Sequence, residues 1–484
     1  GSVTGTASSG NNGNENLIEG NTIIGGYYGI YTYGSTTAGL YNTNNVIKDN
    51  KIEDFYMYGI YMWGQDGVKA LHNDVSRPTR TGVTTTYGVY VSTNMNVWVE
   101  GNRVHDIFEG VTANTTSTAY CIYLADDGTA TERNTAINNA VYNIKKTNGT
   151  VYGIYVPNYY YWDILHNTVV LDDPSSTAGT TDGIYAYGTS LKVMNNIVYI
   201  TRGGTGTKHL LNYNTSTATS IPTSDNNILY INAPAGSNYV GRVNATDYAT
   251  LANWQTAHGG TLDQLSMDVD PMFQSVATGN LYPNNAAFAF AGAALGVAQD
   301  ITGLTRNPAT PTPGAYEVLP STGVDVGISG MEDPVQKLCY GTTETVKVVL
   351  RNYSANAINF ATSPVTVNVS VTGPNATTFT PVVINTGTLP SQDTIHVTIT
   401  TTYNMTAAGS YVFSAHTTAT GDANTPNDAM VDVTIVVEAL SAGTVTSQPE
   451  GFCVTPGTPT LTVTGNSGGT IQWQEASDPA GPWT

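Results

Sequence analysis

A tyrosine-rich pentapeptide recurs through the first half of the chain, and its spacing constrains the fold more than any other feature. The six copies begin at residues 28, 58, 87, 120, 152 and 182, and read YGIYT, YGIYM, YGVYV, YCIYL, YGIYV and DGIYA. A fixed period of roughly 20–50 residues is typical of solenoids, in which each repeat stacks as one coil on the next. Stacked parallel coils place like residues above like, about 4.8 Å apart.

An asparagine column repeats with a similar period. An asparagine precedes an apolar segment at Asn21, Asn50, Asn73, Asn102, Asn139, Asn167, Asn196 and Asn227. Most gaps are 23–31 residues, and the single 37-residue gap leaves room for a bulging loop. Each period therefore predicts two strands separated by turn residues. We expect the asparagines at the corners of the coils, with amides bonding from rung to rung and to turn backbone.

Alternation along the pentapeptide assigns the two faces of its strand. The aliphatic third residue and the residue two positions later are mostly apolar, so they are predicted to face inward. The tyrosines between them are then predicted to form an outward ladder: Tyr31, Tyr61, Tyr90, Tyr123, Tyr155 and Tyr185, extended sideways by Tyr33, Trp63 and Tyr187. Such a ladder suits stacking on sugar rings or packing at a protein interface. The interpretation that we favour from the sequence is intramolecular, with loops folded over the rings or neighbouring rings stacked to stabilise the sheet.

Composition supports an all-β chain and excludes two classes of partner. Of the 484 residues only 11 % are charged, and the formal net charge is −19. Nucleic acids and anionic membrane surfaces need a basic footprint, so we expect neither as a partner. No apolar run approaches the length of a membrane span, and we expect no membrane insertion.

These repeats resemble the right-handed parallel β-helix family, the pectate-lyase-like solenoids, over roughly residues 13–232. Residues 268–317 look like the closing segment of secreted bacterial members, and the matching positions are Asp270, Pro271, Phe273, Asp300, Gly303, Arg306, Gly314, Ala315 and Glu317. The resemblance implies a parallel β-helix over residues 1–245 and a C-terminal capping segment over 246–320. Within that segment, residues 246–259 predict a short helix. Solenoid ends need such caps, because an open last coil exposes strand edges.

After residue 320 the sequence pattern changes to predicted strands in which Thr and Val alternate, spaced as in a seven-strand sandwich. Residues 321–438 resemble the adhesion-type Ig-like domains of long secreted bacterial proteins, through Asp325-Val-Gly, the strand around Asn352 and GDANTPNDA at 421–429. Residues 439–484 resemble the start of a further, truncated Ig-like module common in large surface proteins of the Bacteroidota. Cys453 is then expected to pair with a cysteine beyond the end. We therefore expect a piece of a longer extracellular or cell-surface protein, with no secretion signal in this part.

Two groups of charged residues are candidates for catalysis in the solenoid. Asp54, Arg77 and Asp106 lie four residues after the asparagine column on successive rungs. They could place an arginine base between carboxylates, or form an ion triad that holds the rungs in register. Asp126 and Asp127 follow a tyrosine strand and could serve a glycosidase or an ordinary turn. For both groups we favour the structural alternative.

One loop offers oxygen donors to a metal ion. GDANTPNDA contains Asp422, Asn424, Asn427 and Asp428, at a spacing compatible with calcium. It lacks the glycine and the distal glutamate of an EF-hand loop, so we favour a bare loop over a calcium site. The scattered histidines and cysteines form no zinc pattern, and we expect no other cofactor.

The leading hypothesis is a non-catalytic structural or adhesive segment of a large cell-surface or filament-forming protein. It predicts self-association or binding to other surface proteins. The alternative is a polysaccharide-binding or polysaccharide-degrading module, a lyase or hydrolase β-helix, with glycans as partners and Ig-like domains as spacers. The sequence leaves open whether the chain is an enzyme. The small share of charged residues, 11 %, argues against it.

Overall fold

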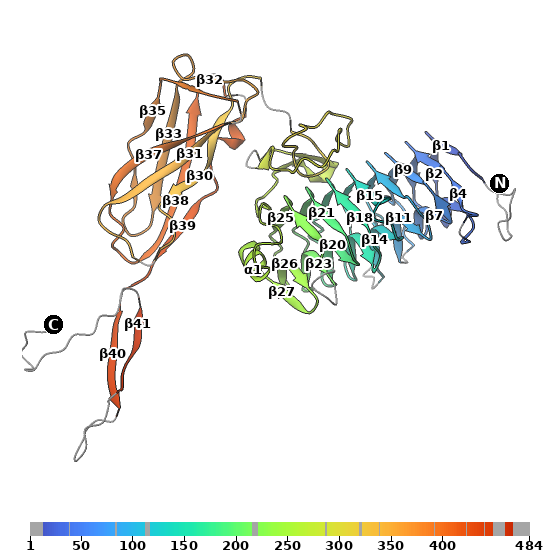
Figure 1. Ribbon diagram of the computed structural model, residues 1–484, viewed down its shortest axis with the longest axis horizontal. Coiled ribbons are helices and arrows are strands. Elements are labelled where there is room, and N and C mark those ends of the chain that lie inside the picture. Colours follow the sequence, from blue (N-terminus) through green and yellow to red (C-terminus); the bar gives the residue numbers. More distant parts are fainter. Residues whose placement is uncertain are drawn as a thin grey trace, which may run out of the picture. The chain divides into compact units, whose positions relative to one another are not determined.

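The structure is a computed structural model, and its chain divides into two compact units, Gly1–Val318 and Leu319–Thr484 (Figure 1). Each unit is described by itself. The structure describes residues 13–37, 39–82, 85–111, 117–214, 221–285, 288–318, 322–337, 339–391, 393–422, 424–439, 441–448 and 460–467. No helix in these ranges is long and apolar enough to cross a membrane.

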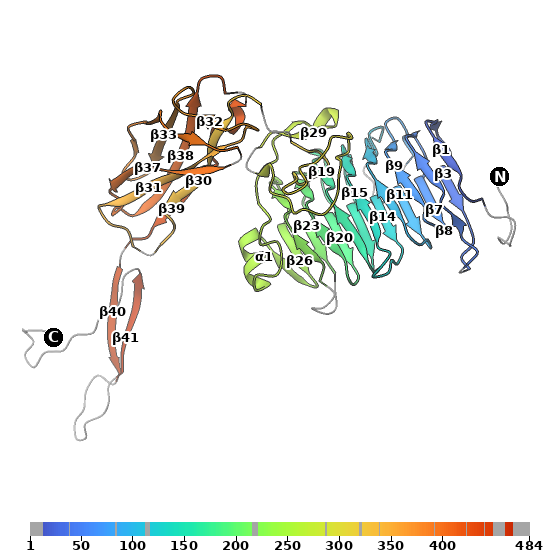
Figure 2. The same ribbon diagram turned by 45° about the horizontal axis from the view of Figure 1, so that its top comes forward.

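The described part of the first unit is a β-helix built from parallel sheets whose strands follow one another in sequence around each coil (Figures 1 and 2). The first sheet contains β1 (Leu17–Glu19), β5 (Val46–Lys48), β9 (Lys69–Leu71), β12 (Trp98–Glu100), β15 (Asn134–Ile137), β18 (Trp162–Leu165), β21 (Lys192–Met194) and β24 (Thr223–Asp225). The second sheet contains β2 (Thr22–Ile24), β6 (Lys51–Glu53), β10 (Asp74–Ser76), β13 (Arg103–His105), β16 (Ala140–Tyr142), β19 (Thr168–Leu171), β22 (Ile197–Ile200) and β25 (Ile228–Ile231).

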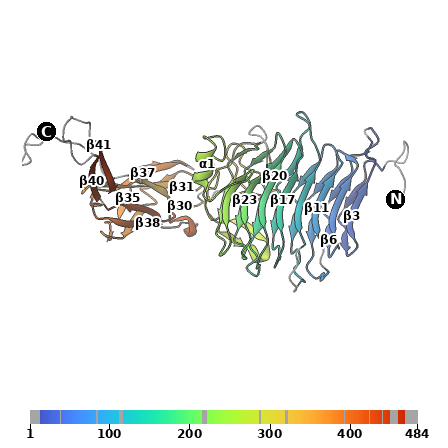
Figure 3. The ribbon, with the colours of Figure 1, turned by 90° about the horizontal axis from the view of Figure 1, so that it is seen from below.

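The third sheet carries the pentapeptides, and its strands lie side by side along the solenoid (Figure 3). It contains β3 (Tyr28–Tyr33), β7 (Tyr58–Trp63), β11 (Thr86–Ser92), β14 (Ala119–Ala125), β17 (Val151–Pro157), β20 (Thr181–Tyr187), β23 (Lys208–Tyr213), β26 (Asn238–Val243) and the antiparallel β27 (Thr246–Tyr248). A short parallel pair, β4 (Asn42–Thr43) with β8 (Gln65–Asp66), extends one corner. Each coil therefore contributes one strand to each long sheet.

The inward positions predicted from alternation form the core. The aliphatic third residues of the pentapeptides are all buried, namely Ile30, Ile60, Val89, Ile122, Ile154 and Ile184. Two positions later, Met62, Val91, Leu124, Val156 and Ala186 are buried as well, and Thr32 is half-buried. Valines and isoleucines of the other two sheets complete the same apolar cluster. The prediction of the inward face is confirmed.

The asparagine column is a continuous hydrogen-bonded ladder along one corner of the solenoid. At each step the side-chain oxygen accepts two bonds from the preceding asparagine, one from its backbone N–H and one from its amide. Asn73, for example, donates to Asn102 Oδ1 from its backbone nitrogen at 3.1 Å and from Nδ2 at 2.9 Å. The ladder runs from Asn21 to Asn227 and ends on the Asp263 carboxylate, 2.9 Å from Asn227 Nδ2. The predicted rung-to-rung bonding is confirmed.

A second ladder runs along another corner. Asn16 donates to Asn45 Oδ1 at 2.8 Å, and Asn45 Nδ2 donates to Gln65 Oε1 at 2.7 Å. The Gln65 backbone nitrogen donates to Asn94 Oδ1 at 2.9 Å. Asn94 in turn donates to the carboxylate of Asp126. An acidic residue therefore ends each ladder, because the last amide needs only an acceptor.

A short helix covers the last coil. Helix α1 (Leu251–Ala257) begins after Thr250, whose side chain accepts from the Asn253 backbone N–H. It starts later than the predicted Thr246, because residues 246–248 pair as β27 instead. Leu251 and Trp254 are buried against the core, and the Trp254 ring lies where a side chain at Gly241 would otherwise project.

The rest of the predicted capping segment does not close the end of the solenoid. It includes β28 (Phe273–Ser275), η2 (Val276–Thr278) and β29 (Asn280–Pro283), and it packs along the outer face of the second sheet (Figure 2). Leu281, Ile301 and Ala315 bury the outward Tyr142 and Val170. Arg306 pairs with Glu317 at 3.0 Å, and both side chains are buried. The outward apolar side chains of the second sheet explain why this segment lies there.

The second unit contains antiparallel sheets that share one core, arranged as a β-sandwich. One sheet contains β30 (Val326–Asp333), β31 (Glu344–Asn352) and β37 (Thr394–Tyr403). The other contains β34 (Thr377–Thr378), β33 (Val365–Thr372), β38 (Gly409–Ala419) and β39 (Val433–Val437), with β35 (Val382–Ile384) also on β33. The short β32 (Ile358–Asn359) pairs with β36 (Thr388–Leu389), η4 spans Thr425–Asn427, and β40 (Ser441–Gln448) pairs with β41 (Thr460–Ser467). The all-β prediction is confirmed.

Replacing Asn102 by alanine should destabilise the solenoid by about 2–4 kcal/mol, because two N–H groups of Asn73 lose a buried acceptor. Chemical denaturation followed by circular dichroism measures the change. Asn232→Ala is the control, since Asn232 is exposed and its amide bonds only to the Tyr230 hydroxyl among the described residues. Equal stability of the two variants would contradict a ladder that carries the coil stacking.

Candidate functional site

The outer face of the third sheet carries two parallel columns of tyrosines, which we call the tyrosine face. The strand register aligns the predicted column of Tyr31, Tyr61, Tyr90, Tyr123, Tyr155 and Tyr185. It also aligns the tyrosines at the first position of the pentapeptide, Tyr28, Tyr58, Tyr87, Tyr120 and Tyr152. We call this set the first column and the predicted set the second column. Rings of both columns contact one another within each strand, as Tyr58 and Tyr61 do at 4.9 Å between centroids.

A glycine explains why both tyrosines of one pentapeptide face outward. Strict alternation would place Tyr152 on the inner face with Ile154, and for this reason the sequence alone did not reveal the first column. A Cβ atom on Gly153 would lie 2.4 Å from Val169 Cγ1 and 2.5 Å from the Gly183 carbonyl oxygen. Residues 153 and 154 therefore both face the core, and the local departure from alternation returns Tyr152 to the outer face. The recurrent Tyr-Gly pair was the available signal.

The rings of the first column stand edge-on to solvent. Tyr87 stacks between two neighbours, with its centroid 4.8 Å from Tyr58 at 8° and 5.0 Å from Tyr120 at 4°. Each ring face in the middle of this column is therefore covered by another ring, and edges and hydroxyls remain. In the second column Tyr61 and Tyr90 meet edge to face at 90°. Most of these side chains are half-buried by their neighbours.

The first rung differs from the rest of the face. Tyr31 is 40 % exposed and Tyr33 is 52 % exposed, whereas Tyr61 on the next rung is only 7 % exposed. Burial raises the pKa of Tyr31 to about 12 and that of Tyr87 to about 12, so the phenols stay protonated at neutral pH. Their hydroxyls can both donate and accept hydrogen bonds.

The tyrosine face carries no charge over its first five strands. Strands β3, β7, β11, β14 and β17 contain no Asp, Glu, Lys or Arg. The first column then continues as Asp182, His209 and Tyr239. His209 lies between two carboxylates, with Nδ1 2.8 Å from Asp182 and Nε2 3.1 Å from Asp247. A neutral aromatic surface therefore ends at a charged cluster.

The predicted sideways extension of the ladder is not continuous. Tyr33 and Trp63 lie beside each other, with centroids 6.3 Å apart. The same column continues with Ser92, Ala125 and Pro157 before it reaches Tyr187. Tyr187 is half-buried and separated from Trp63 by three rungs.

The structure does not align Asp54, Arg77 and Asp106 as an outward ladder, so that arrangement is corrected. Arg77 is fully buried at a corner, where Nε donates to the Phe55 carbonyl oxygen at 2.8 Å and Nη2 to that of Gly82 at 2.6 Å. The carboxylate of Asp54 instead accepts from backbone nitrogens of residues 79 and 80, both at 3.0 Å. Desolvation lowers the pKa of Arg77 to about 10. The guanidinium turns inward because backbone carbonyls there satisfy its donors.

Asp106 belongs to a histidine cluster on the second sheet. His105 Nδ1 lies 2.9 Å from Asp106, and Nε2 lies 3.0 Å from Asp74. The imidazole stacks on Tyr142 with centroids 4.8 Å apart. Desolvation lowers the pKa of His105, but hydrogen bonds to Asp106 and Asp74 outweigh it and raise the pKa to about 9. His209 repeats this arrangement with Asp182, Asp247 and Tyr239. In both clusters the imidazole bridges two carboxylates of neighbouring coils, which is a structural role.

The side chains of Asp126 and Asp127 accept hydrogen bonds from different residues. Asp126 is 2 % exposed and accepts from the Asn94 backbone nitrogen at 2.7 Å and from its Nδ2 at 2.9 Å. Burial raises the pKa of Asp126 to about 7. Asp127 accepts from the Tyr160 backbone nitrogen at 2.9 Å. A glycosidase needs both carboxyl groups open to the substrate, which this arrangement does not offer.

The predicted calcium donors lie in the second unit, at η4 and the turn before it. Asp422 accepts from the Val326 backbone nitrogen at 3.0 Å, and Asn427 Nδ2 donates to Asp325 at 2.7 Å. Asn424 donates its backbone N–H to Asp422 at 2.9 Å. Asp325, far away in sequence, joins this group and was missed. No set of three or more His, Cys, Asp or Glu side chains is arranged to hold a metal ion among the described residues.

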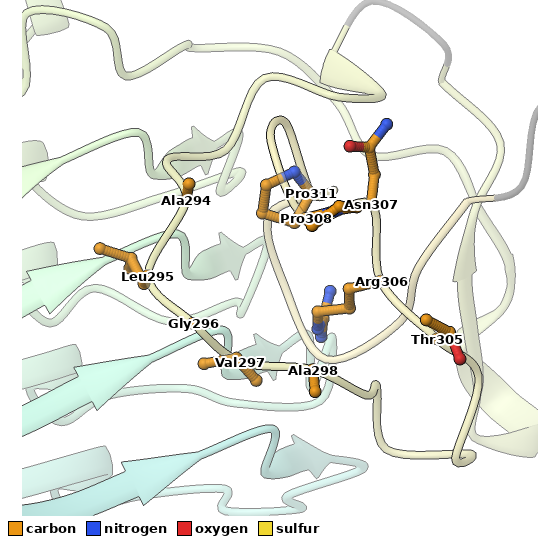
Figure 4. A pocket seen from close by; sticks show the side chains of 10 residues that line it. All are labelled: Ala294, Leu295, Gly296, Val297, Ala298, Thr305, Arg306, Asn307, Pro308 and Pro311. Carbon is orange, nitrogen blue, oxygen red and sulfur yellow. The ribbon is translucent and has the colours of Figure 1, made fainter.

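A surface cavity of about 250 Å³ lies in the segment that covers the second sheet (Figure 4). It is lined mainly by small and apolar residues, among them Leu295, Val297 and Pro311. Arg306 at its wall already donates to Glu317 and to the Gly314 carbonyl oxygen. The cavity therefore combines apolar walls with a guanidinium that serves the fold.

The cysteines do not form a pair in the described part of the chain. Cys121 occupies the glycine position of its pentapeptide and is buried, and burial raises its thiol pKa. Cys339 is exposed. Cys453, for which a partner beyond the end was predicted, lies outside the described residues.

The His105 cluster should make stability depend on pH. Its folded pKa of about 9 lies above the unfolded value, so its contribution is complete below about pH 6.5 and fades as the pH rises to about 9. His105→Gln should cost on the order of 1–2 kcal/mol at pH 6 and less at pH 9. Denaturation at the two pH values measures this difference. A cost independent of pH would exclude a charged imidazole.

Comparison with known proteins agrees with the solenoid. A family model described as a right handed beta helix region matches residues 4–198. Two solved structures of the CARDB domain of a Pyrococcus furiosus protein are also similar. The crystal structure, in complex with di-metal ions, has 15 % identity, covers 25 % of this chain and 95 % of that chain, and has a TM-score of 0.19. The solution structure has 19 % identity, coverage of 25 % and 98 %, and a TM-score of 0.18. No curated protein matches. The first unit therefore contains a right-handed parallel β-helix.

Proposed function

We propose that this chain is a non-catalytic structural or adhesive segment of a large extracellular, cell-surface or filament-forming protein. Its binding surface is the tyrosine face, and the partner we favour is a second copy of the chain. The carrying observation is an uncharged double column of tyrosines whose hydroxyl edges point away from the core. Tyrosine is enriched at protein interfaces, where it combines apolar area with a hydrogen-bonding tip.

Ring orientation favours a protein partner over a sugar. A sugar ring stacks on the face of an aromatic ring, but the faces of Tyr58, Tyr87 and Tyr120 are covered by their neighbours. Edges and hydroxyls suit an opposing protein surface, which can interdigitate with them. The lack of charge matters too, because two copies that each carry a net charge of −19 repel each other, and an uncharged face adds no local repulsion at their contact.

The carboxylates and the arginine suggested for catalysis have structural bonds. Asp126 ends an asparagine ladder, Arg77 donates to backbone carbonyls, and Asp106 pairs with His105. General acid–base chemistry needs a side chain within reach of a substrate proton. These bonds support a non-catalytic role. The β-sandwich with its alternating strands supports an Ig-like spacer in the second unit, as in surface proteins of the Bacteroidota.

Polysaccharide binding is the second candidate, and the first rung favours it. Tyr31 and Tyr33 are the most exposed rings of the two columns and their extension, so they could stack on a sugar there. A glycan bound at this site would contact one end of the tyrosine face, whereas a second copy would cover its middle.

Sedimentation velocity over a range of concentrations tests self-association directly. We expect reversible association of the wild-type chain, and Tyr90→Asp with Tyr123→Asp should weaken it about 30-fold or more, since buried charges oppose an interface. Tyr31→Asp should weaken it less, because Tyr31 lies at the edge of the face.

Tyr160→Asp is the matched control, since Tyr160 is an exposed loop tyrosine outside the two columns. Circular dichroism confirms that each variant folds. A wild-type chain that stays monomeric and binds neutral polysaccharides on a glycan array would contradict the proposal and support the second candidate. Association unchanged by Tyr31→Asp and by the double variant would place the interface elsewhere.

A further inference from the structure

Four tyrosine rings pack as a nearly parallel group on the first two strands of the tyrosine face. Within β3, the centroids of Tyr28 and Tyr31 are 4.7 Å apart and the ring planes differ by 17°. Within β7, Tyr58 and Tyr61 stack at 4.9 Å and 19°. Between the strands, Tyr31 stacks on Tyr61 at 4.8 Å and 22°. Each phenol therefore has another phenol directly beside it.

Strand pairing decides which ring atoms of Tyr31 and Tyr61 are neighbours. β3 and β7 run parallel, and Tyr31 lies opposite Tyr61 in their register. The centroid distance of 4.8 Å equals the spacing of adjacent strands, so one ring is nearly a translation of the other along the solenoid. Equivalent carbons of the two rings therefore lie side by side, including the Cε atoms next to the hydroxyl.

Tyr31 is the member of this pair that a dissolved reagent can reach. Its ring is exposed, whereas Tyr61 is buried beneath its neighbours. Burial and the neighbouring phenols raise the pKa of Tyr31 to about 12, so the group is a neutral phenol at physiological pH. A proton released from its hydroxyl passes directly to water. An oxidant can therefore act on Tyr31 first and on Tyr61 through the ring contact.

Tyr33 offers a comparison within the same strand. It is more exposed than Tyr31, but the residue opposite it on β7 is Trp63, with centroids 6.3 Å apart. Its ring meets Tyr31 edge to face, at 5.7 Å and 62°. Tyr33 is thus open to a reagent and has no phenol stacked on it from the neighbouring strand.

We propose that Tyr31 and Tyr61 form an oxidative cross-linking site, at which a haem peroxidase with hydrogen peroxide joins them as dityrosine. Each phenol gives up one electron and its hydroxyl proton and becomes a phenoxyl radical. The two radicals form a bond between their Cε atoms, and the hydrogen on each of these carbons moves to the oxygen, which restores both phenols. Hydrogen peroxide accepts the two electrons and two protons and becomes two molecules of water.

The cross-link fastens the first described coil to the next one. β3 pairs with β7 alone in the described part of the third sheet, so its coil has one neighbouring coil there. End units of a stacked array open most easily, because a single interface holds them. A covalent bond between adjacent coils restricts the opened chain, as a disulfide does. Both tyrosines belong to one chain, so this site does not depend on association of the tyrosine face.

Peroxidase treatment of the full chain, at a dilution where sedimentation velocity shows a monomer, tests the site. We expect dityrosine fluorescence and, after proteolysis, a cross-linked peptide pair joining Tyr31 to Tyr61 as the main product by mass spectrometry. Hydrogen exchange of the β3 amides should slow in the cross-linked chain, because the coil can no longer open freely. Tyr61→Phe should remove most of the dityrosine, since phenylalanine keeps the ring and forms no phenoxyl radical.

Tyr33→Phe is the matched control, because it removes a more exposed phenol of the same strand that has no stacked tyrosine on β7. It should leave the dityrosine yield unchanged, and circular dichroism checks that both variants fold. The proposal is overturned if the oxidised monomer contains no dityrosine, or if Tyr33 is cross-linked as often as Tyr31. A yield unchanged by Tyr61→Phe also overturns it. Cross-links found only between chains would overturn it as well and leave the proposed interface standing.

Discussion

Asparagine side chains bonded from coil to coil set the geometry on which the rest of the β-helix depends. Each rung of the ladder joins two coils through a buried carboxamide, as between Asn73 and Asn102. The same step, repeated along the solenoid, brings neighbouring tyrosines to centroid distances of 4.8–5.0 Å, as in Tyr58, Tyr87 and Tyr120. The tyrosine face and the ladder therefore follow the same coil spacing, which the parallel strand pairing of the third sheet also imposes. Each stacked aromatic pair contributes about 0.5–1.5 kcal/mol to folding stability, and this stabilises the sheet.

Buried arginine and lysine side chains donate hydrogen bonds to turns at the corners of this solenoid, whereas the first five strands of the tyrosine face carry no charged residue. Arg202 is buried and donates to the Lys146 carbonyl oxygen and the Thr181 hydroxyl, both at 2.6 Å. Lys208 donates to carbonyl oxygens of the turns, including that of Ala235 at 2.7 Å. Burial lowers the pKa of both groups. Where loops leave carbonyls unpaired, a buried cation satisfies several at once, which explains why Arg77 also lies inside.

Periodicity was enough to predict the coils, the inward aliphatic residues and the asparagine ladder, because all three repeat with the coil. It was not enough for features created between distant residues. Arg77 was placed outward by its position in the coil, and only its bonds to the carbonyl oxygens of Phe55 and Gly82 show why it turns inward. Tyr28 and its column were missed because the glycine at 29 breaks alternation. Asp325 joins the 421–429 loop through strand pairing, which the spacing within one loop cannot reveal.

The central claim is that another copy covers the tyrosine face, and hydroxyl-radical footprinting of assembled material against isolated chain tests it most directly. Tyrosine oxidation is read residue by residue by mass spectrometry. The account predicts that Tyr90, Tyr123 and Tyr155 become protected on assembly, whereas the loop residue Tyr160 stays equally reactive. Equal oxidation of the three column tyrosines in both samples would contradict it and leave the face as part of the fold alone.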